Sequence, residues 1–431
     1  IPALNLDDLL GVLTRGVSEF KAGARSLLGV PTSTTQMADL MMPTSTGKIK
    51  KLLMTTNGRG ADASYLNVLR TLAENMPDTQ FTILATGKST RERIEGVLAE
   101  MKDDGRIQDI SRFKVVDAGS NFSIWAQDSI LVQGNTFIAP DRMWYPGYGD
   151  RDVAQLAADA NPGFQAIEFH GMYVDGGNEI ASPEYLFVGS DALKFAASQM
   201  SSFPMQEYVI NGMHLVGIPG ETKEDLARRI IETRFPSQKL VIIGSENPNG
   251  AMEQPGFHID MAVSMLGNDL KTRRPVAVVG DPSMAKRLII QAKERDPQGY
   301  QRAVDEIKSK LSSPAEDPLQ DLQDAADERY QERFDDVAKT LKEEGFIVDR
   351  IPHLGTERLA HRAPWITYNN MLLDEDRIFM PVFGLPALDN AAKAVYEKRG
   401  YNVVPVDMVT ISSLEGAINC ITKVLEREIA A

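Results

Sequence analysis

The sequence predicts an α/β fold, and two observations support that prediction. From Lys51 onward a short apolar run, a turn, an amphipathic helix and another apolar run follow one another several times, which is typical of strands joined by helices. With 43% hydrophobic and 25% charged residues, the composition is ordinary for a globular protein and excludes a disordered or low-complexity chain. We expect one main domain over residues 47–431, preceded by a separate segment over residues 1–46.

The first segment is predicted to be helical. Over residues 1–28 apolar side chains recur at helical spacing, at Leu6, Leu9, Leu10, Leu13 and Val17. A stretch rich in Ser, Thr, Pro and Gly then runs from Pro31 to Gly47, which is typical of a linker. We therefore interpret residues 1–46 as a helical arm followed by a linker.

In the main domain, predicted strands and helices alternate. Short apolar runs predict strands at residues 52–56, 81–85, 240–244, 275–280 and 377–381. Amphipathic segments predict helices near residues 64–76, 90–102 and 387–399, and one more from Pro282. The order of these elements favours sheets with helical crossovers.

Residues 301–350 differ in composition from the rest. They hold 14 acidic and 8 basic residues, a net charge of −6. Leu322, Phe334 and Val337 recur there at helical spacing. We interpret residues 300–345 as an acidic helical insertion. It could present a solvated face or a surface that binds a partner, and both roles stay open.

Charge and cysteine content exclude several classes of protein. A net charge of −14 opposes binding to nucleic acid or anionic membrane, and a single cysteine excludes a disulfide framework and a multi-cysteine metal site. No run of about 18 apolar residues predicts a spanning helix. We find no motif for phosphate loops, serine hydrolases, HExxH zinc sites or dinucleotide binding. The chain begins with Ile1, so cytoplasmic and secreted locations both stay open.

The single thiol, Cys420, is a candidate nucleophile. It follows a turn containing Gly416, and we expect an amphipathic helix after it, through Val424 and Leu425. A helix N-terminus would favour the thiolate. The alternative is a buried core cysteine, since free cysteine is among the most buried residue types.

His258 and Asp260 stand two residues apart. On an extended strand both side chains would point to the same face, which would place an imidazole beside a carboxylate. Cysteine and histidine together can perform nucleophilic catalysis. The alternative is a core histidine that bonds to a neighbouring aspartate.

Two further fragments carry carboxylates. Asp175 precedes two glycines and Asn178 after the apolar run 172–174, where backbone can approach a ligand closely. Asp128 follows Trp125 at the end of an expected strand from Phe122. Taken alone, each carboxylate also suits an ordinary turn residue.

Together the four fragments resemble, in order, the signature of the guanidine-modifying (pentein) superfamily. The closest likeness is to the branch of agmatine deiminases and bacterial peptidylarginine deiminases. The matching segments are Trp125-Ala-Gln-Asp128, Asp175-Gly-Gly, His258-Ile-Asp260 and Gly416-Ala-Ile-Asn-Cys420-Ile-Thr422. Tyr368-Asn-Asn-Met-Leu-Leu and Met380-Pro-Val-Phe-Gly-Leu-Pro with Asp389 are also similar, so the resemblance spans roughly residues 50–428.

The sequence departs from that signature at three places. Gln127 stands where the family usually has Arg, and Asn419 where agmatine deiminases usually have His. Glu415-Gly-Ala replaces a longer glycine run. The proposed catalytic positions are present, and the departures bear on the choice of substrate.

The resemblance implies an α/β propeller of about five ββαβ-type modules around a pseudo-fivefold axis. It also implies roles for the site residues. Cys420 would attack the guanidinium carbon, His258 would move protons, and Asp175 would hold His258, with Glu179 as its alternative. The substrate-binding residues would be Asp128, Asp260, Trp125 and Asn178.

The expected reaction is hydrolytic deimination of a guanidino group to a ureido product and ammonia, without metal or cofactor. The expected partner is a small-molecule or peptidyl guanidino substrate, and not nucleic acid or membrane; assembly into a homo-oligomer stays open. If the substrate is an arginine derivative, Arg142 or Arg151 is the candidate partner of its carboxylate. An amidinotransferase and a non-catalytic binding or effector protein are the alternatives.

Overall fold

The computed structural model describes residues 39–59, 62–141, 148–169, 171, 173–246 and 252–429. The predicted helical arm and most of its linker therefore lie outside the described residues. The end of the linker packs onto the main domain, because the Met42 amide donates to the Val132 carbonyl (2.8 Å) and the Thr44 amide to the Ala181 carbonyl (2.8 Å).

Among the described residues, five sheets of three or four strands share one pattern. In each, two strands pair antiparallel and one of them pairs in parallel with another strand. The first sheet contains β21 (Thr422–Glu428), β1 (Lys48–Thr56), β2 (Gln80–Ala85) and β3 (Phe113–Asp117). The second contains β4 (Leu131–Gln133), β5 (Thr136–Pro140) and β6 (Gln165–Phe169), and the third β7 (Glu179–Ala181), β8 (Tyr185–Gly189) and β11 (Lys239–Ile243).

The remaining sheets follow along the chain. The fourth contains β14 (Val263–Asn268), β15 (Pro275–Asp281), β16 (Ile347–Leu354) and β17 (Ile366–Thr367). The fifth contains β18 (Leu372–Asp374), β19 (Arg377–Val382) and β20 (Asn402–Asp407). Two small hairpins complete the strands: β9 (Tyr208–Ile210) with β10 (Met213–Leu215), and β12 (Ser245–Glu246) with β13 (Met252–Glu253).

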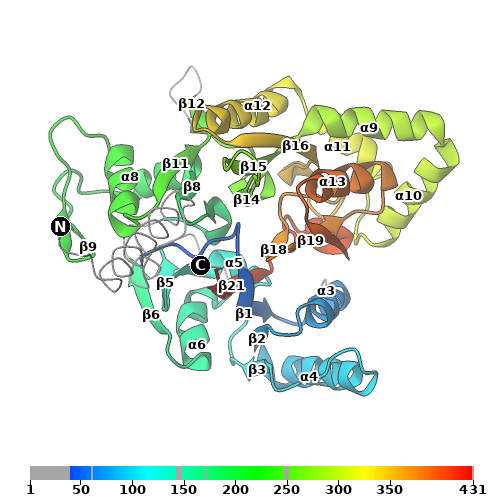
Figure 1. Ribbon diagram of the computed structural model, residues 1–431, viewed down its shortest axis with the longest axis horizontal. Coiled ribbons are helices and arrows are strands. Elements are labelled where there is room, and N and C mark those ends of the chain that lie inside the picture. The colour runs from blue at the N-terminus through cyan, green and yellow to red at the C-terminus, as the bar shows by residue number, and fades with distance from the viewer. Residues whose placement is uncertain are drawn as a thin grey trace, which may run out of the picture.

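Helices connect the parallel strands. They are α3 (Asp62–Asn75), α4 (Gly87–Asp103), α6 (Val153–Ala160), α7 (Ser190–Gln199), α8 (Lys223–Arg234) and α13 (Pro386–Lys398). Four more, α9 (Pro282–Arg295), α10 (Pro297–Ser309), α11 (Pro318–Ala325) and α12 (Glu328–Glu343), lie between β15 and β16. In Figure 1 these helices lie mostly around the periphery, whereas β1, β14, β18 and β21 lie nearer the middle.

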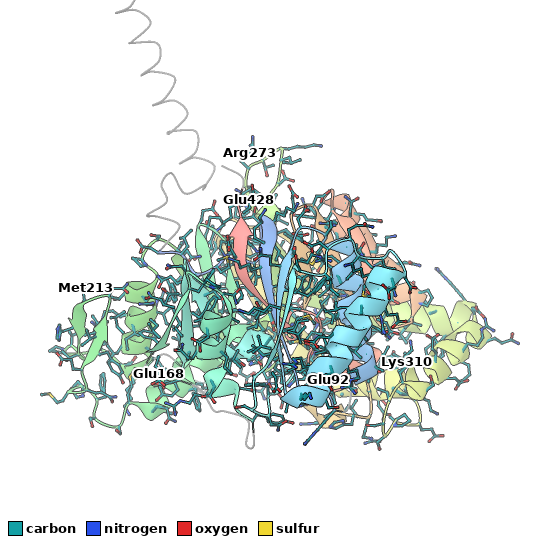
Figure 2. All side chains as sticks on the ribbon, turned by 90° about the horizontal axis from the view of Figure 1, so that it is seen from below. Glu92, Glu168, Met213, Arg273, Lys310 and Glu428 are labelled. Atoms are coloured by element: carbon teal, nitrogen blue, oxygen red, sulfur yellow. The ribbon has the colours of Figure 1, made fainter. Side chains whose placement is uncertain are left out.

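The two ends of the main domain meet in one sheet. β21 pairs antiparallel with β1, from Lys48 opposite Glu428 to Met54 opposite Thr422. Figure 2 shows this neighbourhood, with Glu428 at the end of β21 beside β1. Because the strand that follows Cys420 is locked to the first strand, residues far apart in sequence are fixed relative to each other.

Local sequence explains where the helices begin. The side chain of Asp281 accepts a hydrogen bond from the Met284 amide, and Pro282 occupies the first turn of α9, a position that needs no amide donor. Thr222 and Asp225 form a reciprocal capping box at the start of α8. The largest buried apolar cluster joins α3, α4, α9, α10 and α13 to β1, β2, β15 and β19.

The predicted strands and helices listed above are confirmed to within a few residues at their ends. The mixed α/β class is confirmed as well. The region predicted to be an acidic insertion contains α11, α12 and most of α10. Within the described residues, no helix has the length and apolar character needed to cross a membrane.

Local predictions around the candidate site are wrong at several points. No helix follows Cys420: residues 422–428 form β21. Ile421, Val424 and Leu425 have the i, i+3, i+4 spacing of a helix face, but Lys423 of the same strand is buried against Glu179. Residues 122–125 are not a strand but precede the short helix α5 (Ala126–Ser129). Side chains take the place of a strand partner as hydrogen-bond acceptors here, since the Ser123 amide donates to Asp150 Oδ1 at 2.8 Å.

Two further local predictions fail in the same way. His258 and Asp260 do not share a strand face, because the 3₁₀ helix η3 (Ile259–Met261) starts directly after His258. Residues 173–174 are irregular and lead into the 3₁₀ helix η2 (Gly176–Asn178). The remaining short helices are η1 (Asp150–Asp152), η4 (Glu357–Leu359) and α14 (Val409–Ser412).

Candidate active site

The site residues occupy equivalent places in the repeated strand pattern. Asp128 lies on α5 just before β4, Asp175 precedes η2 and β7, and His258 precedes η3 and β14. Asn370 lies just before β18, and Cys420 just before β21. Each of these segments thus leads into the edge strand of a sheet that pairs antiparallel with its neighbour, which is how residues 128 to 420 reach one place.

His258 lies between two carboxylates. Its Nε2 is 3.3 Å from Asp175 Oδ2, and its Nδ1 is 3.6 Å from Asp128 Oδ1. The His258 side chain is 5% exposed and that of Asp128 3%, so water screens these contacts little. The arrangement favours a protonated imidazole held from both sides.

The two glycines after Asp175 make this packing possible. A Cβ on Gly177 would lie 2.4 Å from His258 Nδ1, and a Cβ on Gly176 would lie 1.8 Å from the Gln127 carbonyl oxygen. The Gly177 amide donates to Asp128 Oδ1 at 3.1 Å. The backbone therefore approaches both His258 and Asp128 more closely than any side chain would allow.

The carboxylates change the protonation of His258. Burial lowers the pKa of the imidazole, but the charges of Asp128, Asp175 and Asp260 and the hydrogen bond to Asp175 outweigh burial and raise that pKa from 6.5 to about 9. His258 is accordingly an imidazolium at neutral pH. It can donate a proton to a leaving group.

Cys420 is buried and held by Asn370. The Asn370 Nδ2 donates to Cys420 Sγ at 3.1 Å, and the Cys420 amide donates to Asn370 Oδ1 at 3.2 Å. Burial, followed by the charges of Asp260 and Asp128, raises the pKa of the Cys420 thiol well above its ordinary value. In this state of the site, the sulfur is a thiol.

Asp260 lies on the other side of that sulfur. Its Oδ2 is 3.9 Å from Cys420 Sγ and accepts a hydrogen bond from Asn419 Nδ2 at 2.9 Å. Burial raises the pKa of Asp260 to about 7, although the charge of His258 and the bond from Asn419 oppose that rise. Asp260 therefore gains or loses its proton close to neutral pH.

Trp125 and Asn178, both predicted to bind substrate, have different surroundings. Trp125 is half-buried and packs on Gly416, where a Cβ would lie 2.3 Å from the indole ring. Asn178 Oδ1 accepts from Gln254 Nε2 at 2.9 Å and from the Ile259 amide at 3.3 Å. The structure thus places Trp125 at the cavity wall and Asn178 behind it, where its side chain supports the loop of His258.

A cavity of about 360 Å³ joins these groups. Its walls contain Trp125, Asp128, Phe257, His258, Glu357, Leu414, Glu415 and Cys420. Asp175 and Asp260 lie behind this wall, against His258 and Cys420 respectively. The chemistry gathered here is a thiol, an imidazolium and carboxylates around one space, which suits a cationic substrate attacked by sulfur.

Sequence reasoning missed three residues at this site: Asn370, Glu357 and Glu415. Asn370 was noted only as part of a strand-like segment, and its link to Cys420 depends on the fold. Glu415 had a signal in the sequence, because it interrupts the glycine run of the family. Arg142 lies outside the described residues, and Arg151 is exposed and lies 3.5 Å from Glu168.

Glu179, the alternative partner of His258, pairs elsewhere. Its Oε1 accepts from Lys423 Nζ at 3.0 Å, with both side chains almost fully buried. No group of three or more His, Cys, Asp or Glu side chains within the described residues is arranged to hold a metal ion.

Comparison with known families and structures supports the resemblance. Residues 312–425 match the family model of the Porphyromonas-type peptidyl-arginine deiminase. The agmatine deiminase of C. jejuni aligns with a TM-score of 0.55 at 12% identity, over 90% of this chain and 96% of that one. The substrate-bound structure of a variant of the same enzyme aligns with a TM-score of 0.54 at 12% identity, over 91% of this chain and 97% of that one.

A third structure extends the comparison. The agmatine deiminase of Enterococcus faecalis aligns with a TM-score of 0.51 at 12% identity, over 92% of this chain and 99% of that one. The search among curated proteins finds no match. The predicted resemblance to the guanidine-modifying superfamily is confirmed, in sequence over residues 312–425 and in fold over about nine-tenths of the chain.

Proposed function

Because the chain resembles the guanidine-modifying superfamily in sequence and in fold, we propose that it hydrolyses a guanidino group to a ureido group and ammonia. The observation that carries this proposal is the single cavity in which Cys420, His258 and Asp128 meet. A guanidinium is planar and cationic, so it needs carboxylates for binding and a strong nucleophile for attack. The cavity offers both.

We also propose that the five sheets form an α/β propeller around a pseudo-fivefold axis. Two observations support this arrangement: the five sheets repeat the same strand pattern, and the site residues occupy equivalent places before the antiparallel edge strand of each sheet. An approximate fivefold axis explains why five separate segments converge.

In the proposed complex, Asp128 and Asp260 bind the guanidinium nitrogens. The two carboxylates lie on opposite sides of the reacting groups, Asp128 next to His258 and Asp260 next to Cys420. A cation placed between them is stabilised by both charges in a buried setting. This position also brings the guanidinium carbon towards the sulfur.

Substrate binding prepares the nucleophile. In the free site, burial and two carboxylates hold the pKa of Cys420 high. A bound guanidinium adds a positive charge beside the sulfur, which lowers the pKa of both Cys420 and Asp260. The thiolate therefore forms when the substrate arrives, and the free enzyme keeps its thiol protonated.

The reaction then proceeds in two halves. The Cys420 thiolate adds to the guanidinium carbon, and His258 gives its proton to the departing amino group, which leaves as ammonia. The product of this half is an S-alkylthiouronium on Cys420 with a neutral His258. Neutral His258 takes one proton from water as the water adds to the same carbon. The carbon–sulfur bond then breaks, and the hydroxyl proton of the adduct passes to the departing sulfur, which releases the ureido product and restores the Cys420 thiol.

Neighbouring side chains hold these groups in place. Asp175 accepts from His258 at Nε2, fixing the ring and stabilising its positive charge. Asn370 holds Cys420 through both its amide and its sulfur. Asn419, where agmatine deiminases usually have His, orients Asp260 by a 2.9 Å hydrogen bond.

The test is turnover of a panel of guanidino compounds, scored for ammonia and for ureido product. Wild type should release both in equal amounts, and Cys420→Ala should retain less than a few per cent of the activity while keeping its melting temperature. A cationic haloacetamidine should label Cys420, with substrate protecting it, and should do so much faster than neutral iodoacetamide.

Each alternative function gives a different result in this test. An amidinotransferase would transfer the amidino group to an added amine and yield no ureido product. A non-catalytic binding protein would bind a guanidino compound equally well with Cys420 or Ala at that position and release nothing. Activity that persists in Cys420→Ala would refute covalent catalysis.

A further inference from the structure

A second cavity continues the active site outward. It has a volume of about 350 Å³ and shares Trp125, Leu414 and Glu415 with the cavity that contains Cys420. Its other walls include Arg59 and His361. A substrate whose guanidinium reaches Cys420 would therefore extend its far end past Glu415 towards Arg59.

Glu415 is in an unusual backbone conformation for its residue type. Its φ is +75°, in the left-handed region that non-glycine residues seldom adopt and that costs energy when they do. Its amide donates to the Ser412 carbonyl at 3.1 Å, and the His361 amide donates to the Ser413 carbonyl at 2.8 Å. These bonds hold the backbone of the Glu415 segment against the opposite loop, and Glu415 lines both cavities.

A second carboxylate lies near Glu415. Glu357 lines the inner cavity with Glu415, and burial followed by the charge of Glu357 raises the pKa of Glu415, while His361 lowers it. Two carboxylates that repel each other at the mouth of the reactive cavity would be stabilised by a cation between them. Because Glu415 also lines the outer cavity, a second cation at the far end of a substrate can reach its carboxylate from that side.

Arg59 supplies the opposite charge in the outer cavity. Its amide donates to Asn57 Oδ1 at 3.0 Å, which fixes the turn, and its side chain is exposed. No ion pair among the described residues involves its guanidinium. The neighbouring Arg93, by contrast, pairs with Asp62 at 2.9 Å. The outer cavity thus presents a carboxylate and an unpaired guanidinium on its walls.

We propose that this outer cavity binds the α-amino-acid end of a free guanidino amino acid, with Glu415 holding the α-ammonium and Arg59 the α-carboxylate. The inference rests on the proposed function and names its substrate class. A guanidinoalkylamine has the ammonium without the carboxylate, so it would leave Arg59 without a partner. A peptidyl arginine has neither free charge, so it would leave both Glu415 and Arg59 without a partner.

The dimensions suit this class of substrate. The Cα of an extended arginine lies about 6 Å from its guanidinium carbon. Trp125, Leu414 and Glu415 line both the cavity of Cys420 and the outer cavity, so a chain of this length leads from one cavity towards the other. The α-carbon of a substrate bound at Cys420 would therefore lie where the two cavities join, between Glu415 and the outer wall.

The experiment compares three substrates with different charges at that end: L-arginine, agmatine and Nα-acetyl-L-arginine amide. Wild type should show its highest kcat/KM with L-arginine. Glu415→Gln should lower kcat/KM for L-arginine and agmatine by about tenfold to a hundredfold, the range of a charged hydrogen bond, and by a clearly smaller factor for the acetylated amide, which has no ammonium for Glu415 to bind. Arg59→Gln should lower it for L-arginine alone.

Two matched variants control for charge and backbone. Glu375 has a φ of +58° and lies in the turn between β18 and β19, and Arg273 has a φ of +61° and lies in the turn between β14 and β15. Glu375→Gln and Arg273→Gln should change no substrate ratio. If Glu415→Gln proves unstable by thermal melting, Glu415→Gly, which suits the positive φ, provides the same comparison.

The outcomes separate this inference from the proposed function. If the three substrates are turned over but both variants leave their ratios as in wild type, or if wild type prefers agmatine or the acetylated amide, the inference is wrong and the deiminase proposal stands. If no guanidino compound is turned over, the deiminase proposal fails. Calorimetric binding of L-arginine to wild type and the same variants then decides whether Glu415 and Arg59 recognise an amino acid.

Discussion

Replacing Asp175 by Asn should shift the pH dependence of catalysis, because this carboxylate stabilises the charged form of His258. Asp260 has a pKa of about 7, and its charged form binds the guanidinium, so kcat/KM should rise with pH through that value. His258 has a pKa of about 9, and its charged form is the proton donor, so kcat/KM should fall above that value. Wild type should therefore give a bell-shaped profile.

The structure sets the size of the shift. Raising the pKa of His258 from 6.5 to about 9 corresponds to roughly 3 kcal/mol of preference for the imidazolium. The charge of Asp128 is the largest single cause of that rise, the hydrogen bond and the charge of Asp175 follow, and the charge of Asp260 is the smallest. Removing the charge of Asp175 alone, with the shape kept by Asn, should lower the basic limb by about one pH unit.

The assay is kcat/KM for the best substrate between pH 6 and pH 10.5, measured as ureido product. The two apparent pKa values of the profile belong to a coupled cluster of ionisable groups. The test therefore compares the profile of the variant with that of wild type, and assigns neither pKa to a single group. Asp117→Asn, at the exposed end of β3, is the matched control and should leave the profile unchanged. A basic limb that stays in place or moves up in Asp175→Asn would show that this carboxylate does not stabilise the His258 imidazolium.

Three further predictions concern binding, packing and stability. Asp260→Asn should lower kcat/KM by about a hundredfold to several thousandfold, the cost of removing one partner of a buried charge pair; a value within threefold of wild type would make the position structural. Gly177→Ala should abolish turnover, because its Cβ would lie 2.4 Å from His258 Nδ1, and unchanged kinetics would contradict the tight packing. Lys423→Met should lower the free energy of unfolding by about 3–5 kcal/mol, since Glu179 is left buried without its 3.0 Å partner. Denaturant titration measures this loss, and the double change with Glu179→Leu should recover much of it.

Much of the secondary structure could be predicted from sequence, because periodicity and capping are local properties. The strand at residues 275–280 and the helix from Pro282 follow from an apolar run and an Asp-Pro start, and the structure has both. The C-terminal strand could not be told from a helix. Its apolar residues Val424 and Leu425 follow Ile421 at helical spacing, and its charged residues Lys423 and Arg427 are buried by partners from distant segments.

The residues of the site were more predictable than their geometry. Cys420, His258, Asp128, Asp175 and Asp260 were recognisable from their motifs and order along the chain. Their local conformations were not, since the 3₁₀ turn after His258 and the short helix at Asp128 are stabilised by side chains from distant segments. Sequence spacing therefore predicted the wrong local conformation for residues that the fold brings together.

The sequence by itself determined the chemical groups: one thiol, a His-x-Asp pair, an Asp-Gly-Gly segment and an acidic net charge. Only the tertiary structure decided which of them meet. It placed Asp175 rather than Glu179 against His258, gave Glu179 to Lys423, and brought Asn370 to Cys420. The physical reason is that each contact joins residues that belong to different sheets. The distance between the two residues therefore depends on how the five sheets pack, and not on their spacing along the chain.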